Sequence, residues 1–197
     1  MVRTQAERSS STRAALLDAT IDCLVDYGYA GTTTTRVAER AGVTRGAQMH
    51  HFQRKAPLVV AALLRLAERR RRELVDRAER ELPDDPDPGA ALDIMWSVFS
   101  GPLFTAALEL WIAARTDPEL AEHLVPAERE IGRGARATAR RFCAGEDVDL
   151  ALELAANAMR GIALQQLLNP SAARRERQLD FLKQTISTHL TPERQTA

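Results

Sequence analysis

The sequence predicts an all-α protein, and two observations support this fold class. Apolar residues recur at helical spacing along most of the chain, and no segment of useful length alternates apolar and polar residues as a strand does. Glycine and proline stand where helices would end or begin, most clearly at Gly28, Gly42 and Pro57. We therefore expect a series of helices joined by short connections.

The first fifty residues predict three helices. Leu17, Ile21 and Leu24 lie on one face of the first helix, and Gly28 follows it as a stop signal. The next two are short and begin near threonines, which are favourable N-cap residues. The three helices are expected at residues 13–27, around residues 37–38, and at about residues 44–50.

Six longer helices are expected in the remainder. The first begins near Pro57, because proline is tolerated in the first turn of a helix. Segment 83–89, which holds three prolines and a glycine, is the clearest loop. Pro126 can break the helix expected at 118–144. The other helices are expected at residues 90–100, 102–115, 148–168 and 172–190.

Charge and cysteine content narrow the class of protein. The formal net charge of +0 conceals a split, because residues 1–56 carry eight Lys and Arg against five Asp and Glu. This excess suggests that the N-terminal part meets a polyanion. Cys23 and Cys143 cannot build a disulfide framework, and no segment is typical of a signal peptide or a membrane span. We expect a cytoplasmic protein.

Residues 32–55 have the pattern of a helix-turn-helix. Ala38 is the small residue that lets two helices approach, Gly42 makes the turn, and Val43 is the apolar residue beneath them. The second helix would enter the major groove, where the guanidinium of Arg45 can pair with both acceptors of a guanine. Threonine hydroxyls at the helix starts suit phosphate oxygens.

Over its first 60 or so residues the sequence resembles the TetR family of regulators. The matching residues are Leu16-Leu17 with Ala19, Gly28-Tyr29, Thr33 with Val37-Ala38, Ala41-Gly42-Val43-Thr44, and His51-Phe52 with Lys55 and Leu58. The resemblance implies that Lys55, at the start of the fourth helix, contacts a phosphate. Taken together, the candidate DNA-binding residues are Thr33, Thr34, Thr35, Arg36, Thr44, Arg45, Gly46, Ala47, Met49, His50, His51 and Lys55.

Two residues depart from the family pattern. Met49 stands where the family usually has tyrosine, so one phosphate hydrogen bond is expected to be lost. Gln48 stands where the family tends to have leucine, which alters either the packing or the contacts of the recognition helix. Neither change removes the helix-turn-helix.

Three other features have competing interpretations. His50 and His51 are neighbours and so point to different sides of a helix, which argues against a metal site. The four arginines of segment 68–73 point all around a helix, so a solvated face is favoured over a DNA-binding stripe. Cys143 follows a basic segment that could lower the pKa of its thiol, although a redox role lacks an evident resolving cysteine.

The second half is expected to bind an effector and to dimerise. The helix at 148–168 is rich in alanine and the helix at 172–190 repeats leucine and isoleucine, so a homodimer is expected through Val148–Leu168 and Ala172–Leu190. Large apolar residues between 95 and 111 are either core or the wall of a ligand cavity. The candidate ligand-binding residues are Met95, Trp96, Phe99, Phe104, Leu108, Trp111, His123, Asn157 and Arg160, with Glu109, Arg115 and Gln165 as further polar candidates.

The resulting hypothesis is a ligand-responsive transcriptional regulator with no cofactor or metal. Residues 1–56 would form the DNA-binding domain and residues 57–197 the effector-binding and dimerisation domain. A homodimer would repress transcription by binding palindromic double-stranded operator DNA, and a small apolar or amphipathic effector would release it. The alternatives are control by a protein partner and activation instead of repression. An enzyme is disfavoured, because no nucleophile–base pair, metal spacing or phosphate-binding glycine loop is found.

Overall fold

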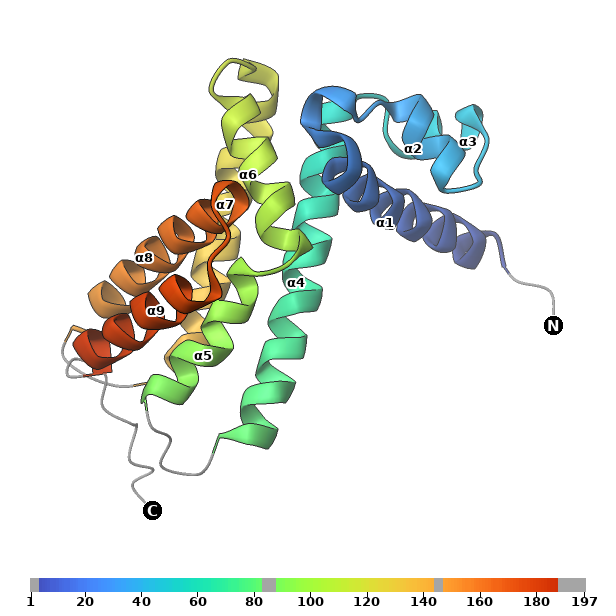
Figure 1. Cartoon of the computed structure of the whole chain (residues 1–197). Helices are drawn as coiled ribbons and strands as arrows, with labels where there is room; N and C mark the ends of the chain where they lie inside the picture. Colours follow the sequence, from blue (N-terminus) through green and yellow to red (C-terminus); the bar gives the residue numbers. More distant parts are fainter. Residues whose placement is uncertain (1–3, 83–87, 144–146, 188–197) are drawn as a thin grey trace. The chain divides into compact units, whose positions relative to one another are not determined.

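The computed structural model describes residues 4–82, 88–143 and 147–187, and within these ranges it holds nine helices and no strand (Figure 1). The all-α prediction is confirmed. The helices are α1 (Gln5–Gly31), α2 (Thr34–Arg40), α3 (Arg45–His51), α4 (Lys55–Glu81), α5 (Pro88–Phe99), α6 (Pro102–Ala114), α7 (Pro118–Ala139), α8 (Val148–Leu168) and α9 (Ala172–Ser187).

The chain forms two compact units. The first contains residues 1–68 and 102–131, and the second contains residues 69–101 and 132–197. Helices α4 and α7 therefore each contribute to both units, whereas α6 belongs to the first. The functional boundary predicted at residue 57 stays a prediction.

The core of the first unit is built on α1, α4 and α6. Leu16 and Leu24 of α1 and Leu63 of α4 have no exposed surface, and neither has Leu110 of α6. Helix α6 packs against α1, and α2 and α3 pack against α1 as well. Helix α1 thus carries the helix-turn-helix on one side and α6 on another.

The core of the second unit lies among α5, α8 and α9. It includes Leu92 of α5, Ala155 and Met159 of α8, and Leu179 of α9, which are all buried. Half-buried Trp96 packs against this cluster. The two C-terminal helices are therefore held together on α5 by one apolar cluster.

Helix boundaries differ from the predictions most clearly in α1 and α7. Helix α1 begins eight residues earlier than expected, because Thr4 accepts a hydrogen bond from the Glu7 backbone N–H while the Glu7 carboxylate accepts one from the Thr4 N–H. Helix α7 continues through Pro126, so the expected break is absent. Helix α8 has the predicted bounds. The described residues do not include residue 144, most of the 83–89 loop, or the end of the helix expected at 172–190.

Gly28 breaks the regular geometry of α1 where the sequence predicts a stop. Its φ of 64° and ψ of −178° are not helical, and the chain then completes a last turn to Gly31. This backbone region is nearly restricted to glycine. A Cβ added at Gly28 would also lie 2.6 Å from a carboxylate oxygen of Glu109 in α6. The kink therefore brings the backbone of α1 close to the carboxylate of Glu109.

Among the described residues, no single helix is long and apolar enough to cross a membrane. The consecutive helices α5 and α6 reach the required length and apolar composition only when they are counted together, across the bend between them.

We expect Gly28→Ala to destabilise the protein by about 2–3 kcal/mol, since it adds backbone strain and displaces Glu109. Gly42→Ala is a matched control, because Gly42 also has a positive φ, 65°, but a Cβ there would meet no atom within 4 Å. Its expected cost is about 1 kcal/mol. Urea denaturation measures both values, and equal losses would show that the approach of Glu109 contributes nothing.

Candidate nucleic-acid interface

Threonine side chains cap both helices of the helix-turn-helix. The Thr33 hydroxyl oxygen accepts the backbone N–H of Arg36 at 3.1 Å at the start of α2, and the Thr44 hydroxyl oxygen accepts that of Ala47 at 3.2 Å at the start of α3. Each cap satisfies an otherwise unpaired N–H of the first turn. Because the oxygen acts as acceptor, the hydroxyl protons stay available to donate to a phosphate.

The turn between α2 and α3 has the geometry that the sequence predicts. Gly42 has a φ of 65°, which glycine adopts without strain, and its N–H donates to the Glu39 carbonyl at 3.1 Å. The N–H of Val43 donates to the Ala38 carbonyl at 3.0 Å, and Ala38 itself is buried. This tight connection fixes the direction in which α3 leaves α2.

Gln48 resolves the question that the sequence left open for its position. Its side chain is 1% exposed, and its amide Nε2 donates to the backbone carbonyl of Phe52 at the end of α3. The glutamine therefore fills a core position and also satisfies a carbonyl at the helix C-terminus. The packing of the recognition helix is retained with a polar residue there.

The remaining side chains of α3 form its open face. Arg45, Gly46, Met49 and His50 are exposed, whereas Ala47 and His51 are half-buried. The rings of His50 and His51 lie edge to face with their centroids 5.3 Å apart. Arg45 forms no ion pair with any residue that the structure describes. The strongest potential base reader is thus both accessible and uncompensated.

Arg36 of α2 is exposed but held by α1. Its guanidinium lies 4.5 Å from the ring centroid of Tyr27 and donates to the backbone carbonyl of Gly31. Arg40 lies near the same ring, at 5.3 Å, and pairs with Asp26 at 2.6 Å. Tyr27 therefore orients two cations along the outer side of α2. Thr34, half-buried, and Thr35, exposed, lie in the same first turn of α2.

Lys55 points inward in this structure. Its ammonium donates to the backbone carbonyl of Tyr29 and lies 3.6 Å from the centroid of the Tyr29 ring. Burial lowers the pKa of this ammonium below its usual value, an effect that the nearby charge of Asp117 opposes. The implied phosphate contact therefore requires the side chain to turn outward, and it stays a prediction.

Tyr29 joins four elements of the first unit through hydrogen bonds. Its backbone N–H donates to Glu109 of α6 at 2.9 Å, and its hydroxyl donates to Asp117, just before α7, at 2.8 Å. Asp117 also accepts the backbone N–H of Leu120 at 3.0 Å. The Leu120 N–H first, and then the Tyr29 hydroxyl, lower the pKa of the Asp117 carboxyl. Burial and the hydrogen bond to Asp117 raise the pKa of Tyr29.

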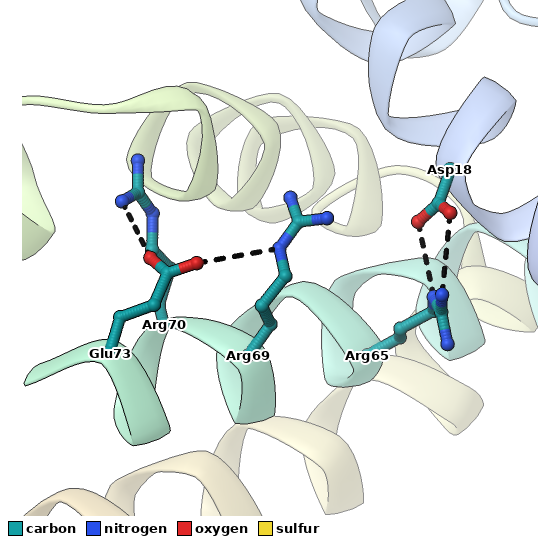
Figure 2. Close-up of polar contacts among 5 residues, drawn as sticks. All are labelled: Asp18, Arg65, Arg69, Arg70 and Glu73. Carbon is teal, nitrogen blue, oxygen red and sulfur yellow. Dashed lines mark hydrogen bonds and ion pairs between the residues drawn. The ribbon is translucent and has the colours of Figure 1, made fainter. Parts of the chain in front are cut away.

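Three arginines of α4 pair with carboxylates of α1 or of α4 itself, as Figure 2 shows. Arg65 binds the Asp18 carboxylate of α1 through two hydrogen bonds of 3.1 and 3.3 Å. Further along α4, Arg69 and Arg70 both reach Glu73, at 3.9 and 2.9 Å. These pairings agree with the prediction that the segment is a solvated face and not a free DNA-binding stripe.

Comparisons with known proteins place this geometry in a family. The family model described as bacterial regulatory proteins, tetR family, matches residues 16–62. The HTH-type transcriptional regulator CymR of Pseudomonas putida is 32% identical over 183 residues, which is 89% of each chain. An uncharacterised HTH-type transcriptional regulator of Mycobacterium tuberculosis is 37% identical over 125 residues, 63% of this chain and 64% of its own length. The match thus spans slightly less than two thirds of that relative.

Solved structures agree with these sequence matches. A TetR family member from Streptomyces coelicolor has a TM-score of 0.66 and 25% identity, covering 88% of this chain and 96% of its own. The multidrug binding protein EbrR complexed with ethidium has a TM-score of 0.64 at 24% identity, which shows a shared fold.

The chain belongs to the TetR family. Its relatives are named as transcriptional regulators, so the predicted family and the predicted class of protein, a transcriptional regulator, are confirmed.

The candidate ligand-binding residues of this TetR family member divide between the two units. Met95, Trp96 and Phe99 are half-buried in the second unit, where the Arg160 guanidinium lies 6.0 Å from the Phe99 ring centroid and donates to Asn157 at 2.6 Å. The first unit holds the others, of which Phe104 is buried, Leu108 and Trp111 are half-buried and His123 is exposed. The role of these residues in binding a ligand stays a prediction.

The structure bears on two polar expectations, of which that for Glu109 stays a prediction. Glu109, considered above as a ligand contact, accepts the N–H of Tyr29. Burial raises the pKa of the Cys143 thiol to about 11, so the expected lowering by nearby arginines is wrong. Those arginines are paired elsewhere, Arg140 with Asp149 and Arg141 with Glu79.

We expect the stability of this protein to fall as pH drops below about 4, the pKa of an unperturbed aspartate. Because the folded-state pKa of Asp117 is depressed, its contribution is complete above that pH and is lost as pH falls through the lower, folded value. Asp117→Asn should flatten this acid limb in thermal unfolding. Asp22→Asn is the control, since exposed Asp22 forms no ion pair with described residues. An acid limb unchanged by Asp117→Asn would contradict this assignment.

Proposed function

We propose that this TetR family protein is a ligand-responsive repressor that binds a palindromic operator as a homodimer. The exposed, uncompensated guanidinium of Arg45 on the open face of α3 is the observation that carries the proposal. Arginine at this place in a helix-turn-helix can donate two hydrogen bonds to a guanine in the major groove. Gly46 beside it adds no side chain that would hold the helix away from the base edges.

The phosphate contacts come from the ends of the same helices. Thr33 and Thr44 retain a hydroxyl proton after capping, and Thr35 and His50 are exposed beside them. Such contacts set the register of α3 on the duplex without reading its sequence. Met49, 45% exposed, offers apolar contact where the family usually has a tyrosine hydroxyl.

An exposed apolar face on α8 supports dimerisation. Leu150, Leu154, Leu164 and Leu168 are spaced so that they share one face, and they are 56%, 53%, 44% and 88% exposed. Gly161 lies on that face, and a Cβ there would meet no atom within 4 Å. Phe181 of α9 is 72% exposed. We propose that a second copy covers these side chains, since exposed apolar helix faces commonly mark interfaces between protein chains.

The proposed effector is a small apolar or amphipathic molecule. Half-buried aromatic side chains support it in both units, Trp96 and Phe99 in the second and Trp111 in the first. Structures of similar fold are complexes with ethidium and with choline. The effector would favour a conformation in which the two recognition helices no longer match successive major grooves, so that operator affinity falls.

We expect Arg45→Ala to weaken operator binding by about 1–3 kcal/mol. Fluorescence anisotropy with DNA upstream of the protein's own gene, or with duplexes selected from a random pool, measures the loss. Arg80→Ala is the matched control, because exposed Arg80 lies about 38 Å along α4 from Lys55 at the standard helical rise. Equal affinities of the wild type and Arg45→Ala would contradict the proposed base contact.

We expect Leu154→Glu to raise the dimer dissociation constant by about tenfold or more, because a carboxylate would be buried without a partner. Sedimentation velocity over a dilution series measures it. The control is Ile112→Glu, since Ile112 of α6 is 60% exposed but lies on neither α8 nor α9. A dimer that resists the Leu154 change would exclude this face as the interface.

A further inference from the structure

Helix α1 extends well beyond the core that it supports. Its first residue is Gln5, whereas its first buried residue is Leu16. The residues from Gln5 to Ser11 are all exposed, and the capping hydrogen bonds between Thr4 and Glu7 hold the first turn. About two turns of helix are therefore fully exposed, and in the next turn, where Thr12, Ala14 and Ala15 are half-buried, the Arg13 side chain is exposed as well, so core packing does not explain it.

Arg13, in this extension, lies against the end of the recognition helix. Its guanidinium is 5.3 Å from the ring centroid of Phe52, the residue that caps the C-terminus of α3. Its charge also contributes to lowering the pKa of the adjacent His51, after burial and the charge of His50. The chain thus places an arginine from α1 beside the last residues of α3.

The charge of Arg13 is not neutralised by the described part of the chain. Three of the four carboxylates of α1 are occupied elsewhere, Glu7 in the capping box, Asp18 by Arg65 and Asp26 by Arg40, and the fourth, Asp22, forms no ion pair with described residues. Arg13 itself is exposed and forms no ion pair with a described residue. An exposed cation at one end of a groove-reading helix suits the anionic backbone that borders the groove.

We propose that Arg13 binds a backbone phosphate of the same duplex, which makes α1 a third DNA-contacting element beside α2 and α3. The inference rests on the proposed DNA-binding function. The guanidinium lies over the Phe52 ring and forms no hydrogen bond with a described residue, so its N–H groups stay available to a phosphate. Because the contact is to the backbone, it adds affinity and salt dependence and no sequence preference.

The test compares the salt dependence of DNA binding for the wild type, Arg13→Met and Arg13→Lys. Arg13→Met keeps an apolar side chain over Phe52 but removes the charge. It should lower affinity at least tenfold and reduce the slope of log affinity against log salt by about 1.8, which is about 0.9 for each subunit of the proposed homodimer, on the operator and on a random duplex alike. Arg13→Lys should restore most of the slope.

The control is Arg8→Met. Arg8 is also exposed on α1 without an ion pair to described residues, but it is five positions away and so points about 140° around the helix from Arg13. Its salt slope should equal that of the wild type. Thermal unfolding of each variant separates a lost phosphate contact from a loosened α3, since the former leaves the melting temperature unchanged.

Two results overturn the inference. A wild-type salt slope in Arg13→Met shows that Arg13 only packs on Phe52, even where Arg45→Ala weakens operator binding as expected. A slope lost equally in Arg8→Met shows general attraction by net charge. A different result would contradict the proposed function: a wild-type protein that binds a selected duplex no more tightly than a random one. In that case the salt slope measured on the random duplex still tests the role of Arg13. Failure to bind any duplex overturns both.

Discussion

The close approach of α1 to α6 at Gly28 is the constraint on which the arrangement of the first unit depends. Only glycine adopts the backbone there without strain, and this lets the Glu109 carboxylate reach the N–H of Tyr29. The Tyr29 side chain then binds Asp117 and its carbonyl holds Lys55. One kink thus ties the helix that supports the recognition helix to the starts of α4 and α7.

Charge in the first unit divides into compensated and uncompensated groups, and this division agrees with the proposed DNA-binding surface. Arg65, Arg54 and Arg40 each pair with a carboxylate of another segment, so they fasten helices to one another. Arg45 and Arg13 form no ion pair within the described residues. Net charge near zero therefore coexists with a locally positive edge, which a whole-chain average conceals.

The sequence predicts the features that depend on neighbouring residues, such as turns and helix caps. It does not predict the contacts that depend on residues distant in the chain. The turn of the helix-turn-helix is predicted by Gly42, which adopts a positive φ without strain, and its helix caps by Thr33 and Thr44, whose hydroxyls accept backbone N–H groups. The early start of α1 was also readable, in Thr4 and Glu7, but was missed. No local pattern shows that Glu109 meets a residue 80 positions earlier, that Lys55 turns inward, or that burial outweighs arginine charge at Cys143.

Membership of α6 in the first unit has a consequence for how the chain folds during synthesis. The apolar face of α1 that meets α6 has no partner until residues near Leu110 leave the ribosome, and the unit is complete only after residue 131. Closing so long a loop is entropically slow compared with forming a local hairpin of helices. The core that supports the helix-turn-helix is therefore incomplete until two thirds of the protein has been synthesised. A fragment ending before α6 would leave Leu16 and Leu24 without part of their core.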